Sequence, residues 1–281
     1  FVDIDPETYN INPGKTNEKI TKRTRAIIPV DQVGLPSDLD KIYQLARKHK
    51  LFVVEDAACA LGSKYQGKRV GSFGDISCIS FHPRKTITTG EGGMILTNNK
   101  DWADKLRILR HQGMSISDVT RHKAKSIIFE KYPVVGYNFR MSDLQAAVGV
   151  EQMKKLPKIL ERRANLAKRY TKNFLKTKFI IPPYVTPGYT HNWQYYVIRL
   201  IKNRKIERGD LMQKLLDVGI ATRIGVMAAH LEKPYRMMYP KLVLPETEIA
   251  ARETTTIPLY FQMTEKEQDY VIEKILGFTE G

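Results

Sequence analysis

Residues 53–99 read VVEDAACALGSKYQGKRVGSFGDISCISFHPRKTITTGEGGMILTNN and hold the pattern that decides the fold. The apolar runs in "VVED" and "ISCISF" have the length of strands; Asp56 ends the first, and Lys85 follows the second by a few residues. Ligands of open α/β sheets bind beyond the carboxyl ends of the strands, so both side chains are expected to face one crevice. The glycines of "TTGEGGM" let the backbone approach a ligand closely.

A lysine and an aspartate in one crevice fit a cofactor that forms a Schiff base. Pyridoxal phosphate needs an amine for its aldehyde and an acid partner for its pyridine nitrogen. A surface ion pair between Lys85 and Asp56 explains the two residues alone equally well.

Outward from this stretch, strands and helices alternate. "AIIPV" (26–30) is predicted as a buried strand, 37–50 as an amphipathic helix capped by Ser37, "MILTN" as a strand, and 101–111 as a helix. The alternation predicts an α/β unit with a mostly parallel central sheet.

The pattern changes after residue 141. Two helices are expected, "MSDLQAAVGVEQMKKL" capped by Ser142 and a longer one with Pro157 in its first turn. A strand in "WQYYVIRL" and helices in "ERGDLMQKLLDVGI" and "TEKEQDYVIEKILGF" follow. These elements predict a large domain at 1–155 and a smaller α+β domain at 156–281, which the long linking helix begins.

Composition excludes several classes of protein. The 281 residues are 42% hydrophobic and carry a net charge of +16, and no apolar run approaches the roughly 18 residues of a membrane span. The basic residues are spread along the chain, without a nucleic-acid-binding motif, so a solvated basic surface or an anionic small substrate is expected. Two cysteines give no disulfide framework, which favours the cytoplasm, and no residue cluster has metal-ligand spacing. The opening "FVDIDPETYNINP" is expected to be an apolar strand, and a preceding segment is expected to be missing.

The stretch 53–99 closely resembles the signature region of the DegT/DnrJ/StrS family of pyridoxal-phosphate aminotransferases. "GYNFRMSDLQAAVGVEQMKKL" is similar to the interface helix of that family, and "TTTIPLYFQMTEKEQDYVIEKI" to its C-terminal end. The resemblance covers nearly the whole chain and implies the fold type I of pyridoxal-phosphate-dependent transferases, as in aspartate aminotransferase.

The resemblance also implies roles for single residues. Lys85 would be the Schiff-base lysine and proton shuttle, Asp56 the partner of the pyridine nitrogen, and Ser80 a ligand of the cofactor phosphate. Asn138 would reach the phosphate in a neighbouring subunit, which implies a homodimer with shared active sites. From the residues alone, Ser80 reads as a strand-end hydroxyl and Asn138 as a turn residue.

Two positions depart from the family pattern. Cys59 stands where relatives usually have glutamine or histidine against the cofactor ring, and we expect a weaker polar contact there. Asp31 stands where many relatives show histidine, which either tunes substrate choice or has no effect. His230 stands where relatives place a histidine near the sugar, and Arg223 lies close before it, so both are expected to bind substrate, although a solvated loop explains His230 equally well.

The implied activity is transfer of an amino group, from glutamate in most relatives, to a keto sugar that is usually linked to a nucleotide. Dehydrating relatives replace the Schiff-base lysine with histidine, so Lys85 favours transamination. A degenerate or regulatory homologue that binds pyridoxal phosphate without turnover, and a cyclitol (inosose) aminotransferase, remain alternatives. Neither a nucleic-acid partner nor a membrane is expected.

Overall fold

The computed structural model describes residues 1–116, 121, 123–201 and 206–280. The helices are α1 (Pro13–Lys19), α2 (Leu39–His49), α3 (Lys100–Arg110), α5 (Asp143–Phe174), α6 (Arg208–Asp217), α7 (Lys233–Met238), α8 (Pro245–Glu253) and α9 (Glu265–Glu280). The strands are β1 (Ala26–Ile27), β2 (Phe52–Asp56), β3 (Lys64–Tyr65), β4 (Lys68–Arg69), β5 (Ile76–Ser80), β6 (Gly93–Leu96), β7 (Ile180–Ile181), β8 (Tyr189–Thr190), β9 (Tyr196–Leu200), β10 (Arg223–Ile224) and β11 (Thr254–Ile257).

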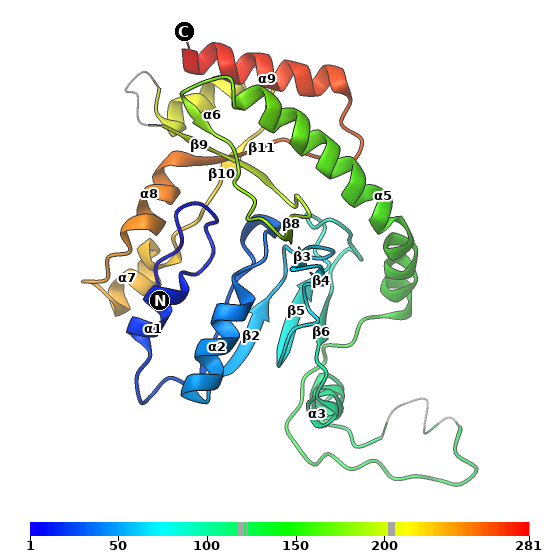
Figure 1. Ribbon diagram of the computed structural model, residues 1–281. Helices are drawn as coiled ribbons and strands as arrows, with labels where there is room; N and C mark the ends of the chain where they lie inside the picture. The colour runs from blue at the N-terminus through cyan, green and yellow to red at the C-terminus, as the bar shows by residue number, and fades with distance from the viewer. Residues whose placement is uncertain (117–120, 122, 202–205, 281) are drawn as a thin grey trace.

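The first sheet has the order β1-β2-β5-β6 (Figure 1). β1, β2 and β5 run parallel, and β6 pairs antiparallel with β5. Helix α2 connects β1 to β2 and packs its buried Ile42 and Ala46 against Ile27 and Val53 of this sheet. The mostly parallel sheet that the sequence predicts is therefore confirmed.

The cap of α2 differs from the prediction. The Asp38 side chain accepts a hydrogen bond from the backbone N of Lys41 at 3.3 Å and caps the helix. Ser37 instead donates its hydroxyl to the carbonyl of Val30 at 3.1 Å. Both residue types cap helices well, so the sequence alone could not choose between neighbours.

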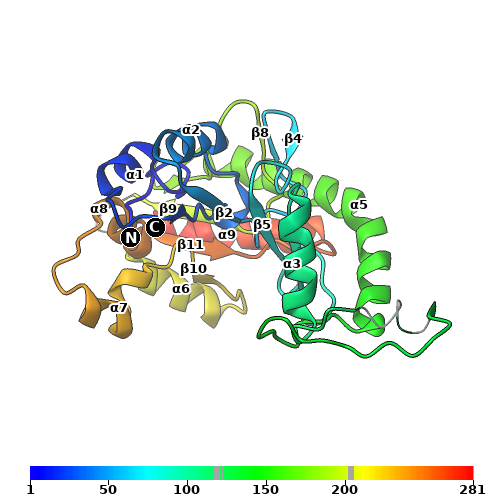
Figure 2. The same ribbon diagram turned by 90° about the horizontal axis from the view of Figure 1, so that it is seen from below.

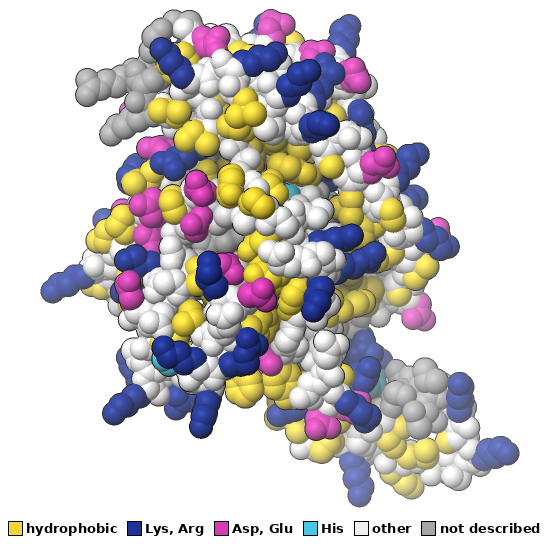
Figure 3. Space-filling model, viewed as in Figure 1, with side chains coloured by type: hydrophobic (Ala, Val, Ile, Leu, Met, Phe, Trp, Pro, Cys, Tyr) yellow, Lys and Arg dark blue, Asp and Glu magenta, His cyan; other side chains and the backbone are white. Residues whose placement is uncertain are grey.

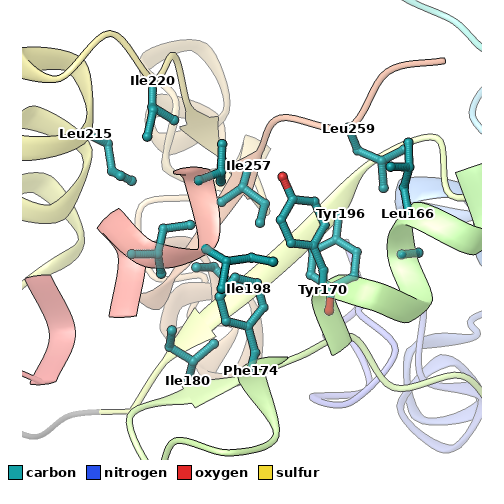
Figure 4. Close-up of a cluster of buried hydrophobic side chains, with 14 of the residues drawn as sticks. Leu166, Tyr170, Phe174, Ile180, Tyr196, Ile198, Leu215, Ile220, Ile257 and Leu259 are labelled. Atoms are coloured by element: carbon teal, nitrogen blue, oxygen red, sulfur yellow. The ribbon is translucent and has the colours of Figure 1, made fainter. Parts of the chain in front are cut away.

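The second sheet has the order β10-β11-β9-β7 and is antiparallel throughout. Helices α5, α6 and α9 pack together over one of its faces, as Figures 1 and 2 show. Their apolar side chains meet those of β9 in the largest hydrophobic cluster, drawn in Figure 4. A small third sheet, β4-β3-β8, joins the two halves of the chain.

One long helix replaces the two predicted helices between 141 and 177. α5 runs from Asp143 to Phe174 with Pro157 inside it, and a capping box between Ser142 and Gln145 begins it. A proline within a helix removes one backbone hydrogen bond and bends the axis, and both ribbon views show α5 changing direction. The predicted domain boundary at 155/156 lies within this helix.

The N-terminal segment is not the strand that its apolar residues predict. Only an isolated bridge joins Ile4 to Ile11. The Asp3 carboxylate instead accepts hydrogen bonds from Thr247 at 2.9 Å to its backbone N and 2.7 Å to its hydroxyl. The segment is thus tied to the start of α8, far away in the sequence.

Candidate active site

Asp56 and Ser80 lie at the same edge of the first sheet because β2 and β5 are parallel. Asp56 ends β2 in register with Cys78, and Ser80 ends β5 two residues later. Asp56 is half-buried, and its Oδ1 accepts a hydrogen bond from the backbone N of Ala58 at 3.1 Å. A carboxylate has further lone pairs, so Asp56 retains capacity for another donor.

Lys85 lies in the turn that follows β5 and meets the turn that follows β2. Its Nζ lies 3.1 Å from Sγ of Cys59, and both residues are half-buried. Cys59 stands three residues after Asp56. The structure therefore brings Lys85, Cys59 and the Asp56 turn together at the carboxyl edge, where the sequence places them.

Local hydrogen bonds hold the Lys85 turn, although it is rich in threonine and glycine. The Thr88 hydroxyl and the Thr89 backbone N both donate to the carbonyl of Phe81, at 2.9 and 3.1 Å. Gly93 serves the pairing of β5 with β6, since a Cβ there would lie 2.8 Å from the carbonyl oxygen of Ile79. These hydrogen bonds tie the turn to the residue that follows β5.

Ser80 is half-buried, and its Oγ accepts a hydrogen bond from the backbone N of His82 at 3.3 Å. This contact matches the local role that the residue alone suggests. A hydroxyl that accepts one hydrogen bond still has its own proton to donate. The geometry therefore leaves Ser80 able to donate to an anion beyond the strand.

Two buried carboxyl groups lie beneath this edge. Glu55 and Asp31 are both 0% exposed. Glu55 accepts hydrogen bonds from the hydroxyl of Ser77 and from the backbone N of Gly71, and Asp31 accepts one from the backbone N of Ser37. Burial raises the pKa of Asp31 well above the usual aspartate range, and the Glu55 charge adds to the rise. Burial also raises the pKa of Glu55, against the effect of the Ser77 hydrogen bond.

Lys85 opens onto a cavity of about 950 Å³ whose lining is basic. Among the residues that the structure describes, no Asp or Glu lines this cavity. Its basic lining residues are Arg84, Lys85, Lys154, Lys155, Lys158, Arg163 and Arg223. A cavity with charges of one sign attracts ligands of the opposite sign, here anions.

The sequence analysis did not predict most of these basic residues as site residues. Lys154, Lys155 and Lys158 share one side of α5, as their spacing in a helix requires. The same spacing also fits a helix face exposed to water, so it did not predict a binding site. Arg163 is buried, and burial lowers its pKa to about 10, so it stays protonated at neutral pH. Arg223, predicted to contact substrate, is exposed on β10 and lines the same cavity.

The other two predicted residues lie apart from Lys85. His230 is 3% exposed, and its Nε2 lies 3.2 Å from Oε1 of Glu248; it does not line the cavity. That hydrogen bond lowers the pKa of Glu248. Asn138 is exposed and forms an isolated β-bridge with His111, beside α3. Contact of His230 with a substrate stays a prediction.

The described part of the chain holds no group of three or more His, Cys, Asp or Glu side chains placed to bind a metal ion. Within the same part, none of the helices has the length and apolar character needed to cross a bilayer. Lys and Arg side chains are scattered over the face shown in Figure 3, in line with the spread of basic residues along the sequence.

Comparison with known proteins places this geometry in a family. The DegT/DnrJ/EryC1/StrS aminotransferase family matches residues 1–276. The uncharacterized protein MJ1066 of Methanocaldococcus jannaschii is 37% identical over 278 residues, which cover 98% of this chain and 72% of that protein. The spore coat polysaccharide biosynthesis protein SpsC of Bacillus subtilis is 34% identical over 285 residues, which cover 100% of this chain and 73% of SpsC.

The solved structures agree. Helicobacter pylori PseC, an aminotransferase involved in the biosynthesis of pseudoaminic acid, matches with a TM-score of 0.92 and 26% sequence identity. The match covers 100% of this chain and 73% of the PseC chain.

Proposed function

This chain belongs to the DegT/DnrJ/EryC1/StrS aminotransferase family and is a pyridoxal-phosphate-dependent sugar aminotransferase, and we propose that its substrate is a keto sugar linked to a nucleotide. The proposed amino donor is glutamate. The observation that carries the nucleotide part of the proposal is the basic cavity onto which Lys85 opens.

The side chains at the carboxyl edge fit pyridoxal phosphate by their chemistry. Lys85 offers a primary amine, Asp56 an anionic acceptor with spare lone pairs, and Ser80 a hydroxyl proton. When bound, the cofactor supplies an aldehyde for the amine and a protonated ring that withdraws electrons. Cys59, in contact with Lys85, is proposed to pack against that ring.

In this proposal Lys85 has two tasks. Its Nζ would hold the cofactor. Once released, it would take a proton from the α-carbon of the amino donor in one half of the cycle, and in the other half give a proton to the sugar carbon that carried the carbonyl. A positioned acid–base group of this kind contributes about 10²–10⁴-fold to the rate. The Asp56 carboxylate would stabilise a positive charge on the cofactor ring nitrogen, because opposite charges favour the ionised forms of both groups.

The lysines of α5 and Arg223 are proposed to hold the diphosphate of the substrate. Charge-assisted hydrogen bonds to phosphate oxygens are about twice as strong as neutral ones, so several cations around one cavity favour such a ligand. An uncharged cyclitol ketone gains nothing from these cations. The degenerate homologue has only the Cys59 departure in its favour.

The test uses the purified protein with pyridoxal phosphate. An absorption band that glutamate shifts, and that Lys85→Ala abolishes, is expected. Amination is then measured with a nucleotide-linked keto sugar and with inosose. We expect the combined Lys155→Ala and Lys158→Ala change to raise KM for the nucleotide-linked sugar about tenfold, since two phosphate contacts are lost.

A matched control is the combined Lys168→Ala and Lys172→Ala change, which removes the same charge from exposed positions of the same helix outside the cavity lining. Equal effects of both pairs would overturn the diphosphate site. Faster turnover of inosose would assign a cyclitol substrate, and binding without turnover would assign the degenerate homologue.

We also propose a homodimer in which Asn138 acts in the site of the second copy. The exposure of Asn138 supports this assignment. Mixing Lys85→Ala with Asn138→Ala protein should restore about one quarter of wild-type activity, because half of the dimers are mixed and each carries one intact site. No recovery is expected if Asn138 acts within its own chain. The free thiols of Cys59 and Cys78 favour a cytoplasmic location, which is likewise a proposal.

A further inference from the structure

Residues 192–194 come from the C-terminal half of the chain but reach both turns of the candidate active site. Asn192 and Gln194 are polar, yet only 2% and 3% of each is exposed. Buried amides require hydrogen-bond partners, and the partners of these two lie on the turns that carry Cys59 and Lys85.

Gln194 holds the two neighbours of Lys85. Its Nε2 donates to the backbone carbonyl of Arg84 at 2.7 Å, and its Oε1 accepts from the hydroxyl of Thr86 at 2.7 Å. An amide supplies a donor and an acceptor in one rigid group, so a single side chain holds the backbone before the lysine and the side-chain hydroxyl of the residue after it.

Asn192 extends the arrangement to the opposite turn. Its Nδ2 donates to the carbonyl of Cys59 at 2.7 Å, and its Oδ1 accepts from the backbone N of Gln194 at 2.8 Å. The contact of Lys85 Nζ with Cys59 Sγ at 3.1 Å closes a ring of interactions. Trp193, between the two amides, has φ of 57°, a conformation that residues other than glycine rarely adopt.

We propose that Gln194 is a positioning residue for Lys85. By holding Arg84 and Thr86, it sets where the lysine amine stands relative to Cys59 and the carboxyl edge. The inference rests on the proposed function, in which Lys85 is the amine that binds the cofactor. Gln194 itself does not touch the reacting atoms in this scheme, and it acts only through the turn.

The experiment measures the reactivity of Lys85 itself. Cofactor-free protein is mixed with pyridoxal phosphate, the product is trapped with borohydride, and the labelled peptide is identified by mass, over a range of pH. A reacting atom misplaced by about 1 Å can lose on the order of 10²-fold in rate, so we expect Gln194→Ala to slow labelling of Lys85 by about 10–100-fold. Its pH profile should shift as well.

Two further variants divide the effect. Thr86→Val removes only one of the two hydrogen bonds and should slow labelling less. The Gln194→Ala/Thr86→Val double variant should label no more slowly than Gln194→Ala, because both changes remove one shared interaction. Additive effects would contradict the proposal. If Gln194→Ala fails to fold, Thr86→Val still decides.

Gln268→Ala is the matched control. Gln268 is also a fully buried glutamine that donates to a backbone carbonyl, that of Leu166 at 2.7 Å, away from the Lys85 turn. It should lower stability without changing the rate or pH profile of Lys85 labelling. Identical profiles for wild type and Gln194→Ala would overturn the positioning role alone. Labelling of another lysine in the wild type would instead overturn the proposed function.

Discussion

Two buried regions of this chain are filled by opposite kinds of side chain. Around β9, Tyr170, Phe174 and Ile198 pack in an apolar cluster and are 0% exposed (Figure 4). Beneath the carboxyl edge of the first sheet, the equally buried Asp31 and Glu55 lie side by side, with Asp31 Oδ2 and Glu55 Oε1 left without a hydrogen-bond donor.

The difference shows that the two regions contribute to stability with opposite signs. Burial of apolar side chains stabilises the fold at every pH, whereas burial of two carboxyl groups costs free energy unless a proton is retained between them. Asp31 also lies within the field of Asp56, whose charge raises the pKa of Asp31 further. The apolar cluster of the C-terminal region therefore stabilises the fold, whereas burial of the carboxyl groups under the candidate site destabilises it.

The largest expected effect is in the apolar region. Phe174→Ala should lower the free energy of unfolding by about 3–5 kcal/mol, because it opens a cavity beside Tyr170, whose ring is stacked on it at 5.7 Å. Urea unfolding followed by circular dichroism measures this. Leu175→Ala, at a neighbouring position that is 69% exposed, should stay within about 0.5 kcal/mol. Similar losses of unfolding free energy for both variants would show that burial in the apolar cluster does not set the stability.

The intermediate effect is a pH dependence in the polar region. Folding raises the pKa of Asp31. As pH rises above the ordinary aspartate range, the unfolded state therefore releases a proton that the folded state keeps, and the free energy of unfolding falls. Asp31→Asn should therefore stabilise the protein by about 1–3 kcal/mol at pH 8, and by less near pH 4. Unfolding curves across that range test the sign.

An exposed carboxylate provides the opposite case. A hydrogen bond from Lys100 lowers the pKa of Asp104, so any contribution of this carboxylate to stability is lost as pH falls. Asp104→Asn should not reproduce the gain at pH 8. A gain from Asp104→Asn equal to that from Asp31→Asn would show that net charge, rather than the buried pair, sets the pH dependence.

The smallest effect is expected on cofactor affinity, at Cys59 in the polar region. Cys59→Ala removes the Sγ contact with Lys85 and should weaken pyridoxal-phosphate binding by less than about tenfold, since thiol contacts are weak. Absorbance titration gives the Kd. Cys78→Ala, which removes the other thiol without touching Lys85, serves as the comparison. Complete loss of the cofactor with Cys59→Ala alone would assign that thiol a larger role.

Local patterns were predicted well. The strands ending at Asp56 and Ser80 follow from apolar runs in the sequence, and α2 follows from its helical periodicity. The hairpin of β3 and β4 was missed, although Gln66 and Gly67 take positive φ as its two turn residues require. Glutamine is an unusual choice there, so the signal was weak.

The continuity of α5 was not predictable from the same rules. Pro157 favours a helix start, and the sequence rules placed a boundary there. Packing of the following turns against the second sheet, through Leu166 and Tyr170, outweighs the lost hydrogen bond. Tertiary contacts thus override a local preference, as they do for the N-terminal segment held by Thr247.

The sequence by itself determined the periodicities of the main elements and the order of Asp56, Ser80 and Lys85 along two strands and the turn that follows the second, because these signals lie between residues close together in the chain. The tertiary structure alone decided which glutamine holds the lysine turn. Thr86 and Gln194 are 108 positions apart, and nothing in the sequence distinguishes Gln194 from a glutamine exposed to water. Hydrogen bonds between distant residues exist only once the chain has folded and excluded water from them.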